Sequence, residues 1–164
     1  MTEPIIKIEA GQKIPEASVH IKSEGGIDAI STTDYFKGRR VVMFAVPGAF
    51  TSTCSAKHVP SFLANAAKFS EAGFDKIACL SVNDAHVMRE WGLSQKTEGV
   101  IDMLADPRAE FSDALGLTRD MGPILGCRAA RCALIIDDGV VQKVFMEEPA
   151  MYEVSSAENV LANL

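Results

Sequence analysis

The sequence predicts an α/β protein in which helices flank a mixed central β-sheet. Apolar runs of strand length alternate with segments of helical periodicity along the middle of the chain, which is typical of strands joined by helices. Near the C-terminus two apolar runs are separated only by Asp138 and Gly139, a pair that favours a tight antiparallel hairpin. No internal repeat, linker or low-complexity tract divides the 164 residues, so we expect a single domain over residues 1–164.

The N-terminal part of the chain predicts a lead-in segment followed by a hairpin. Residues 1–17 contain two prolines and would form at most a short edge strand. Residues 18–22 alternate between apolar and polar side chains, as a half-buried strand does, and residues 27–31 supply the return strand after a glycine-rich turn. A brief helical turn is expected at residues 33–36. The hairpin would extend the sheet at its N-terminal side.

The clearest strand is the unbroken apolar run at residues 41–46, which predicts a buried position in the sheet. Pro47 and Gly48 end this strand in a turn. A helix is expected from residue 53 to residue 72, because its apolar residues have roughly helical spacing. Pro60 falls inside it and should kink it, since proline has no backbone N–H to donate.

The second half of the chain continues the alternation of strands and helices. The strands expected there are residues 76–82, 103–105, 131–137 and 140–146. Asn83 or Asp84 should cap the helix that follows the first of these strands, because short polar side chains accept hydrogen bonds from the first free N–H groups of a helix.

Two further helices and one loop complete the predicted fold. Asp106 and Pro107 are expected to open a helix, as a cap followed by proline at the first helical position. Residues 118–130 contain glycines and a proline without periodicity and predict a long loop. Ser155 or Ser156 should cap a final helix.

The composition argues against several classes of partner. The formal net charge is −6 and no block of basic residues occurs, so nucleic acid and anionic membrane surfaces are not expected partners. The apolar runs are too short to span a bilayer. The N-terminus has neither the basic nor the apolar region of a secretory signal, so we expect a cytoplasmic location.

The cysteines and histidines do not form a recognisable metal or disulfide pattern. The cysteines are Cys54, Cys79, Cys127 and Cys132. They are too few for a disulfide scaffold, and no two of them have the CxxC spacing. The three histidines are scattered along the chain, so we expect no metal site and no cofactor.

Cys54 is the residue that most clearly points to chemistry. It follows a buried strand, a Pro-Gly turn and a run of hydroxyl residues, which together would place it at the N-terminus of a helix. Free N–H groups and the positive end of the helix dipole stabilise a thiolate there. A strand, a turn and a cysteine at a helix tip describe a thioredoxin-like arrangement. Thr51 occupies the position that the first cysteine of a CxxC motif would have. A lone thiolate beside a hydroxyl is suited to attack on an external substrate, and peroxide is the natural fit.

The same segment carries a family resemblance. The pattern Pro47-x-x-x-Thr51-x-x-Cys54 resembles the active-site motif of peroxiredoxins, and the longer sequence VPGAFTSTCSAKHVPSF is similar to the peroxiredoxin-V or type II subfamily. The resemblance continues at 80–84, 106–107, 114–117, 128–131 and 155–158. It implies a thioredoxin-like fold and a thiol-dependent peroxidase that reduces hydrogen peroxide and alkyl hydroperoxides.

The resemblance also implies a role for each matched residue. Cys54 matches the peroxidatic nucleophile, and Thr51 matches the residue that holds the peroxide oxygens and the sulfur. Pro47 matches the proline that shields the pocket, and Arg131 matches the arginine that stabilises the thiolate and the transition state. A cation at the start of a central strand also needs an anionic partner if it is buried. Arg128 remains the competing candidate for the role of Arg131.

The other three cysteines do not identify the thiol that reduces Cys54 after its oxidation. Cys79 and Cys132 are expected in the core, whereas Cys127 is expected to be exposed. Residues 148–164 contain no cysteine, although some peroxiredoxin-V proteins carry a resolving cysteine in that region. We therefore expect an external reductant, either glutathione with glutaredoxin or thioredoxin. The resemblance further implies a homodimer.

Two other functions remain open from the sequence. One is a peroxide sensor that signals through oxidation of Cys54, and the other is a dithiol oxidoreductase that uses Cys54 with Cys79. The histidines His20, His58 and His86 are expected to be non-catalytic, and His58 is the least secure of these because it lies one turn after Cys54.

Overall fold

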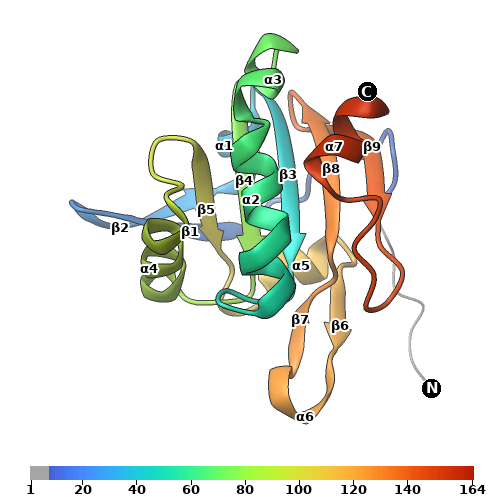
Figure 1. Ribbon diagram of the computed structural model, residues 1–164. Coiled ribbons are helices and arrows are strands. Elements are labelled where there is room, and N and C mark those ends of the chain that lie inside the picture. The colour runs from blue at the N-terminus through green and yellow to red at the C-terminus, as the bar shows by residue number, and fades with distance from the viewer. Residues whose placement is uncertain (1–7) are drawn as a thin grey trace.

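The computed structural model describes residues 8–164, which form a seven-stranded sheet with helices on both faces (Figure 1). The strands of this sheet are β1 (Ser18–Ser23), β2 (Gly26–Ser31), β3 (Arg40–Val46), β4 (Lys76–Ser81), β5 (Ile101–Ala105), β8 (Cys132–Asp137) and β9 (Val140–Met146). Their order across the sheet is β2-β1-β5-β4-β3-β8-β9. The predicted lead-in segment lies partly outside the described residues, and Lys13 makes an isolated bridge to Val140 of β9.

The sheet is mixed, as the sequence predicts. Strands β3, β4 and β5 are parallel to one another, whereas β8 pairs antiparallel with β3. The hairpin β1–β2 joins the β5 side and the hairpin β8–β9 forms the other side. This arrangement of a parallel centre, an N-terminal hairpin and flanking helices is the predicted thioredoxin-like α/β fold.

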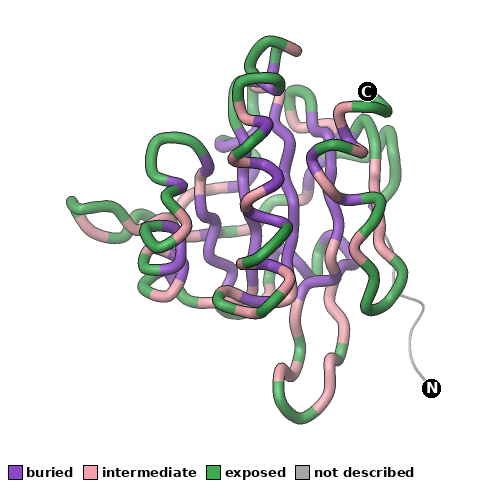
Figure 2. Tube along the Cα trace, viewed as in Figure 1, coloured by how far each residue is buried: buried purple, intermediate pink, exposed green. Residues whose placement is uncertain are grey.

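Successive residues of β3 face opposite sides of the sheet. Val42, Phe44 and Val46 pack in one hydrophobic core, and the residues between them pack in the other. We call these sides the Phe44 face and the Met43 face. All residues of the strand after Arg40 are buried, and Figure 2 shows the same burial along the neighbouring central strands.

Helices cover both faces. They are α1 (Thr32–Phe36), α2 (Val59–Ala64), α3 (Ala66–Glu71), α4 (Ala85–Gln95), α5 (Glu110–Ala114), α6 (Gly122–Leu125) and α7 (Ala157–Ala162), with a π-helical turn at Cys54–His58. Phe62 of α2, Phe69 of α3 and Trp91 of α4 pack on the Phe44 face. Phe36 of α1 and Phe111 of α5 pack on the Met43 face.

The predicted caps of two helices are confirmed. The Asp84 carboxylate accepts a hydrogen bond of 2.9 Å from the Val87 N–H at the start of α4. At the start of α7 the hydroxyl of Ser156 accepts one of 3.2 Å from the Asn159 N–H. Each bond satisfies a backbone donor that has no partner within the helix.

The helix predicted over residues 53–72 is right in its span, since residues 52–71 are helical apart from Asn65, but the prediction of one continuous helix is wrong. The π-helical turn, α2 and α3 follow one another, and the backbone of Asn65, which lies between α2 and α3, is not helical. Pro60 has no N–H and cannot donate a hydrogen bond to the carbonyl of Ala56, so regular α-helical bonding is interrupted where the π-helical turn meets α2.

The prediction of a loop over residues 118–130 is also wrong. Strands β6 (Thr118–Asp120) and β7 (Cys127–Ala129) pair antiparallel, and α6 lies between them. In Figure 1 this hairpin extends away from the main sheet. Each strand has only three residues, and α6 has no buried residue, so neither produces a periodic apolar pattern.

The helix predicted at Asp106 begins later than expected. α5 starts at Glu110, and Pro107 lies in the preceding turn. The Asp106 carboxylate nevertheless serves the helix start, because it accepts hydrogen bonds from the N–H groups of Phe111 and Ser112 at 3.2 and 2.8 Å.

Candidate active site

Cys54 lies in the first turn of the helical segment after β3, and its side chain belongs to the core of the Phe44 face. The Ser55 N–H donates to the Thr51 carbonyl at 3.0 Å, so the helical bonding begins at Thr51. The hydroxyl of Thr53 makes no capping bond, contrary to the prediction that a hydroxyl side chain caps this helix. The helix tip itself is where the sequence placed it.

The first turn of this segment is wider than an α-helix. Residues Cys54–His58 form a π-helical turn, in which the Val59 N–H bonds to the carbonyl of Cys54. Cys54 and His58 are four residues apart and therefore lie on the same side of the turn. Both are fully buried, with 0% of their surface exposed.

Thr51 contacts the sulfur directly. Its Oγ1 lies 2.8 Å from Cys54 Sγ and 2.7 Å from the carbonyl oxygen of Gly48. A hydroxyl carries one proton, so Thr51 can donate to only one of these two acceptors at a time. A thiolate is the stronger acceptor of the two, since a hydrogen bond to an ionised group is stronger than one to a neutral carbonyl.

Arg131 reaches the sulfur from the other side. The residue precedes β8, and by strand alternation it faces the same side as Ala133, which lies in the core of the Phe44 face. Its Nη2 donates to Cys54 Sγ at 3.1 Å. Arg128, the competing candidate, instead donates to the carbonyls of Leu125 and Val82 at 2.8 and 3.1 Å.

His58 joins this group, which the sequence reasoning missed. Its Nδ1 lies 2.9 Å from Nη1 of Arg131, and its Nε2 lies 3.0 Å from the carbonyl oxygen of Ser155. Burial, together with the positive charge of Arg131, lowers the pKa of His58 to about 3. The spacing of four residues from Cys54 was the sequence signal that could have placed His58 at the site.

The turn between β3 and Cys54 is fixed by neighbouring groups. Pro47 begins it and is half-buried. The N–H of Ala49 donates to the Asn83 side-chain oxygen at 2.9 Å. A Cβ atom on Gly48 would lie 3.3 Å from the Thr51 side chain, so the absence of a side chain at Gly48 leaves room for Thr51.

The other cysteines lie in three different settings. Cys79 is buried in the same core as Cys54, and burial followed by the charge of Cys54 raises the pKa of Cys79 well above its ordinary value. Cys132 is buried on the Met43 face, and burial raises its pKa to about 12. Cys127 is exposed on β7. These positions confirm the three predicted environments.

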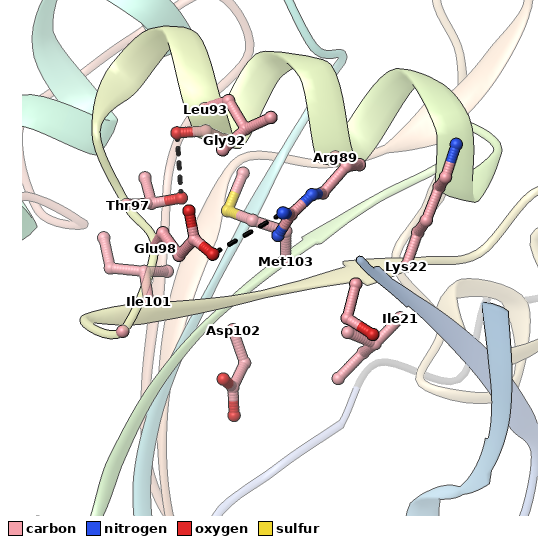
Figure 3. Close-up of a pocket in the computed structure, with 12 residues that line it drawn as sticks. Ile21, Lys22, Arg89, Gly92, Leu93, Thr97, Glu98, Ile101, Asp102 and Met103 are labelled. Carbon is pink, nitrogen blue, oxygen red and sulfur yellow. Dashed lines mark hydrogen bonds and ion pairs between the residues drawn. The ribbon is translucent and has the colours of Figure 1, made fainter. Parts of the chain in front are cut away.

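A separate hollow of about 220 Å³ lies between β1, α4 and β5 (Figure 3). Arg89 and Glu98 form an ion pair of 3.5 Å at its rim, and the Thr97 hydroxyl donates to the Gly92 carbonyl at 3.1 Å. No sulfur of a cysteine lines it, and it shares no residue with the group around Cys54. Its other charged side chains also have partners, since Lys22 lies 3.0 Å from His86 Nδ1 and Asp102 accepts a hydrogen bond of 2.7 Å from Tyr35, and we assign the hollow no chemistry.

The part of the chain that the structure describes has neither a metal-binding cluster nor a membrane-spanning helix. Residues 8–164 contain no group of three or more His, Cys, Asp or Glu side chains that is arranged to hold a metal ion. None of the helices formed by these residues has the length and apolar character needed to cross a membrane.

Comparison with known proteins agrees with the geometry. The Redoxin family matches residues 9–161. Chloroplastic peroxiredoxin-2E of Arabidopsis thaliana is 38% identical over 169 residues, which cover 99% of this chain and 72% of that protein. The crystal structure of reduced Prx3 from Vibrio vulnificus in complex with H2O2 is 44% identical, has a TM-score of 0.92 and matches 94% of this chain and 98% of that one. The crystal structure of peroxiredoxin 5 from Alvinella pompejana is 35% identical, with a TM-score of 0.83 and coverage of 94% and 96%.

The fold and these matches define a thiol-dependent peroxidase with a thioredoxin-like fold. Within that class the chain belongs to the peroxiredoxin family, in its type II, peroxiredoxin-V-like branch. The resemblance seen in the motif around Cys54 is therefore confirmed over the whole chain.

Proposed function

We propose that the protein reduces hydrogen peroxide and alkyl hydroperoxides through Cys54. The thiolate attacks one oxygen of the peroxide, so an S–O bond forms and the O–O bond breaks. Cys54 is oxidised to a sulfenic acid, and the leaving hydroxide or alkoxide takes a proton from solvent to become water or an alcohol. Hydrogen peroxide is also the ligand of the similar Vibrio vulnificus Prx3 structure.

The observation that carries this proposal is the pair of donors on the Cys54 sulfur. Thr51 Oγ1 lies 2.8 Å from Sγ and Arg131 Nη2 lies 3.1 Å from it. Both stabilise a thiolate before peroxide arrives. During attack, negative charge moves to the leaving oxygen, and the same donors can follow it because they are already oriented. We assign Pro47, which is half-buried at the start of the turn, the role of limiting the access of water to this site.

We propose that an external thiol completes the cycle, with glutathione and glutaredoxin as the first choice and thioredoxin as the alternative. Residues 148–164 contain no cysteine, and Cys79 is buried with a raised pKa, which keeps it a protonated, poor nucleophile. A first thiol would form a mixed disulfide with Cys54 and release water. A second thiol would then attack the external sulfur of this mixed disulfide, so that the two external sulfurs form a disulfide and Cys54 leaves as the reduced thiol. Because Cys54 is 0% exposed, its turn must open for this exchange.

We also expect a homodimer, and we keep the predicted cytoplasmic location as a prediction. Phe50 is 57% exposed at the turn before Cys54, and Ile124 is 92% exposed on α6. Apolar side chains this exposed are typical of a protein contact surface when they cluster. Sedimentation should show a dimer at micromolar concentration, and a chain that remains monomeric there would contradict this assignment.

The test is peroxide consumption by the wild type, Cys54→Ser and Cys127→Ser with each reductant system in turn. We expect Cys54→Ser to lose activity and Cys127→Ser, an exposed thiol changed in the same way, to keep it. Full activity of Cys54→Ser would refute the role of Cys54. A sulfenic acid that forms on Cys54 but is recycled by none of the thiols would instead favour the peroxide-sensor function.

A further inference from the structure

His58 connects Arg131 to a distant part of the chain through both of its ring nitrogens. Arginine has no acceptor, so the contact of 2.9 Å between Arg131 Nη1 and His58 Nδ1 requires an unprotonated Nδ1. The Ser155 carbonyl has no donor, so the contact of 3.0 Å at Nε2 requires a proton on Nε2. One neutral tautomer satisfies both contacts.

The surroundings of His58 favour this neutral form. Burial, and then the charge of Arg131, lower the pKa of His58 to about 3. The ring also packs among Phe44, Phe62 and Tyr152, with centroid distances of 4.7, 5.7 and 5.2 Å. An aromatic enclosure of this kind holds the ring plane and excludes water.

The carbonyl that orients His58 is itself held by Glu147. Oε2 of Glu147 accepts hydrogen bonds from the N–H groups of Glu153 and Ser155 at 2.8 and 2.9 Å and from the Ser155 hydroxyl at 2.6 Å. Oε1 accepts from the Val154 N–H at 3.2 Å. A carboxylate that collects four donors fixes this loop, and through it the position of the Ser155 carbonyl.

The guanidinium of Arg131 is held by a hydrogen bond to His58 and also lies over the ring of Tyr152, 5.9 Å from its centroid. Among residues 8–164, its hydrogen-bond partners are the Cys54 sulfur and His58 Nδ1, and it forms no ion pair with a carboxylate. A carboxylate in the place of His58 would also hold the guanidinium, but it would offset its positive charge. A neutral imidazole holds it and leaves that charge available to the sulfur.

We infer that His58 is a positioning residue of the peroxidase reaction, which acts by holding Arg131 so that Nη2 faces the Cys54 sulfur. The inference rests on the proposed function of Cys54 and Arg131. It assigns His58 no contact with peroxide and no proton transfer. It differs from a purely structural role because the effect of removing His58 must pass through Arg131.

Trp91 provides a direct readout of the first step. It is the only tryptophan in the chain, and its Nε1–H donates to the hydroxyl of Ser55 at 2.9 Å, next to Cys54. Rapid-mixing fluorescence can therefore follow the oxidation of Cys54 by hydrogen peroxide without any reductant. Two apolar variants, His58→Phe and His58→Leu, remove both hydrogen bonds, so that one remains measurable if the other does not fold. His58→Asn is the conservative variant, because its amide oxygen can replace Nδ1 as an acceptor for Arg131.

We expect the apolar variants to slow the oxidation of Cys54 about 10- to 100-fold, the usual effect of a small misplacement of a reacting group. His58→Asn should recover most of the rate. In an Arg131→Met background, His58→Phe should cause no further loss, because the residue through which it acts is already gone. The pH dependence of the rate should keep its shape in every His58 variant.

Three results would overturn the inference. One is an unchanged oxidation rate in a folded apolar variant. Another is an equal loss with and without Arg131, which would indicate a structural role. The third is an inflection in the wild-type pH profile that the apolar variants lack, which would make His58 a proton acceptor. Peroxidase activity in Cys54→Ser would refute the proposed function instead, so the two failures can be told apart.

Discussion

The hydroxyl of Thr51 lies between two acceptors, the Cys54 sulfur at 2.8 Å and the Gly48 carbonyl oxygen at 2.7 Å. Only one proton is present, so its donation depends on the charge of the sulfur. When Cys54 is a thiol, the Thr51 hydroxyl can donate its hydrogen bond to the Gly48 carbonyl, and the thiol can donate one to the Thr51 oxygen. When Cys54 is a thiolate, the Thr51 O–H rotates so that it donates its hydrogen bond to the sulfur. Thr51 therefore responds to ionisation of Cys54 without moving its side chain.

Thr51→Val should slow the oxidation of Cys54 by about 100-fold, the scale expected when one preorganised donor to a developing charge is lost. Valine keeps the shape of threonine, so the loss reports the hydroxyl. Thr51→Ser keeps the hydroxyl and should remain close to the wild type. The rates can be measured by the fluorescence of Trp91 after mixing with peroxide.

Thr53→Val is the matched control for that experiment. Thr53 is two residues away on the same turn, and its side chain makes no capping hydrogen bond. We expect its rate to match the wild type. Equal losses in both variants would show that the segment tolerates no change of threonine, and the specific role of Thr51 would be abandoned.

Arg131→Met and Arg128→Met distinguish the two arginines that the sequence left in competition. Arg131 donates to the sulfur, whereas Arg128 donates to backbone carbonyls of Leu125 and Val82. We expect Arg131→Met to lower the rate of Cys54 oxidation about 100- to 1000-fold. Arg131→Lys should fall in between, since it keeps the charge but not the forked geometry.

Arg128→Met should instead lower stability by about 1 kcal/mol for the hydrogen bonds lost, with little change in the oxidation rate. Urea unfolding measured beside the kinetics separates the two effects. A loss of rate in Arg128→Met as large as that in Arg131→Met would contradict the assignment of Arg131 alone as the arginine that stabilises the Cys54 thiolate.

The part of the site around Cys54 was predictable because its residues are close together in the sequence. The buried strand, the Pro-Gly turn and the spacing of Thr51 to Cys54 all lie within one short segment. Arg131 comes from far along the chain; the family resemblance pointed to it, but Arg128 stayed in competition until the structure placed Nη2 of Arg131 at 3.1 Å from the Cys54 sulfur. His58 was missed because a buried histidine is usually only a packed one, and because its hydrogen-bond partners, Arg131 just before β8 and Ser155 just before α7, are far away in the sequence.

The fold was predictable where an apolar pattern was strong and failed where it was absent. The run at Val41–Val46 and the Asp138–Gly139 turn gave the right strands. The β6–β7 hairpin has strands of three residues with few buried side chains, so its pairing left no pattern. The π-helical turn at Cys54 depends on a shift of one hydrogen bond, which composition does not encode.

Oxidation with one equivalent of peroxide should leave no disulfide between Cys54 and Cys79. Cys79 lies in the same core as Cys54, but burial holds its pKa well above the ordinary value, so it stays protonated and attacks slowly. Intact mass should increase by one oxygen, or by a glutathione adduct when glutathione is present. Cys79→Ala should behave in the same way as the wild type.

Cys127→Ser is the comparison variant, because that thiol is exposed and far less constrained. We expect it too to leave the mass change unaltered. A loss of two hydrogens in the wild type that disappears in Cys79→Ala would revive the dithiol oxidoreductase that the sequence left open.

Mild acid should destabilise the fold through His58. Burial and the charge of Arg131 lower its pKa from 6.5 to about 3, so the folded chain keeps it neutral while the unfolded chain binds a proton below about pH 6.5. The stabilisation is therefore complete above about pH 6.5 and is lost progressively as the pH falls toward 3, by up to about 1.4 kcal/mol per pH unit. Tyr152 and Glu147 also face this ring, and the loss of Glu147 hydrogen bonds would add to the effect only at lower pH.

Urea unfolding between about pH 7.5 and about pH 5 isolates the histidine, because few carboxylates titrate in that interval. The free energy of unfolding should fall toward acid in the wild type and stay nearly level in His58→Phe. His86→Asn is the control, since His86 is exposed, its Nδ1 lies 3.0 Å from Lys22 Nζ and it makes no hydrogen bond to the group around Cys54; this variant should keep the wild-type slope. A wild-type curve that is flat in this range would mean that His58 is protonated in the folded chain, and a neutral acceptor for Arg131 would then be untenable.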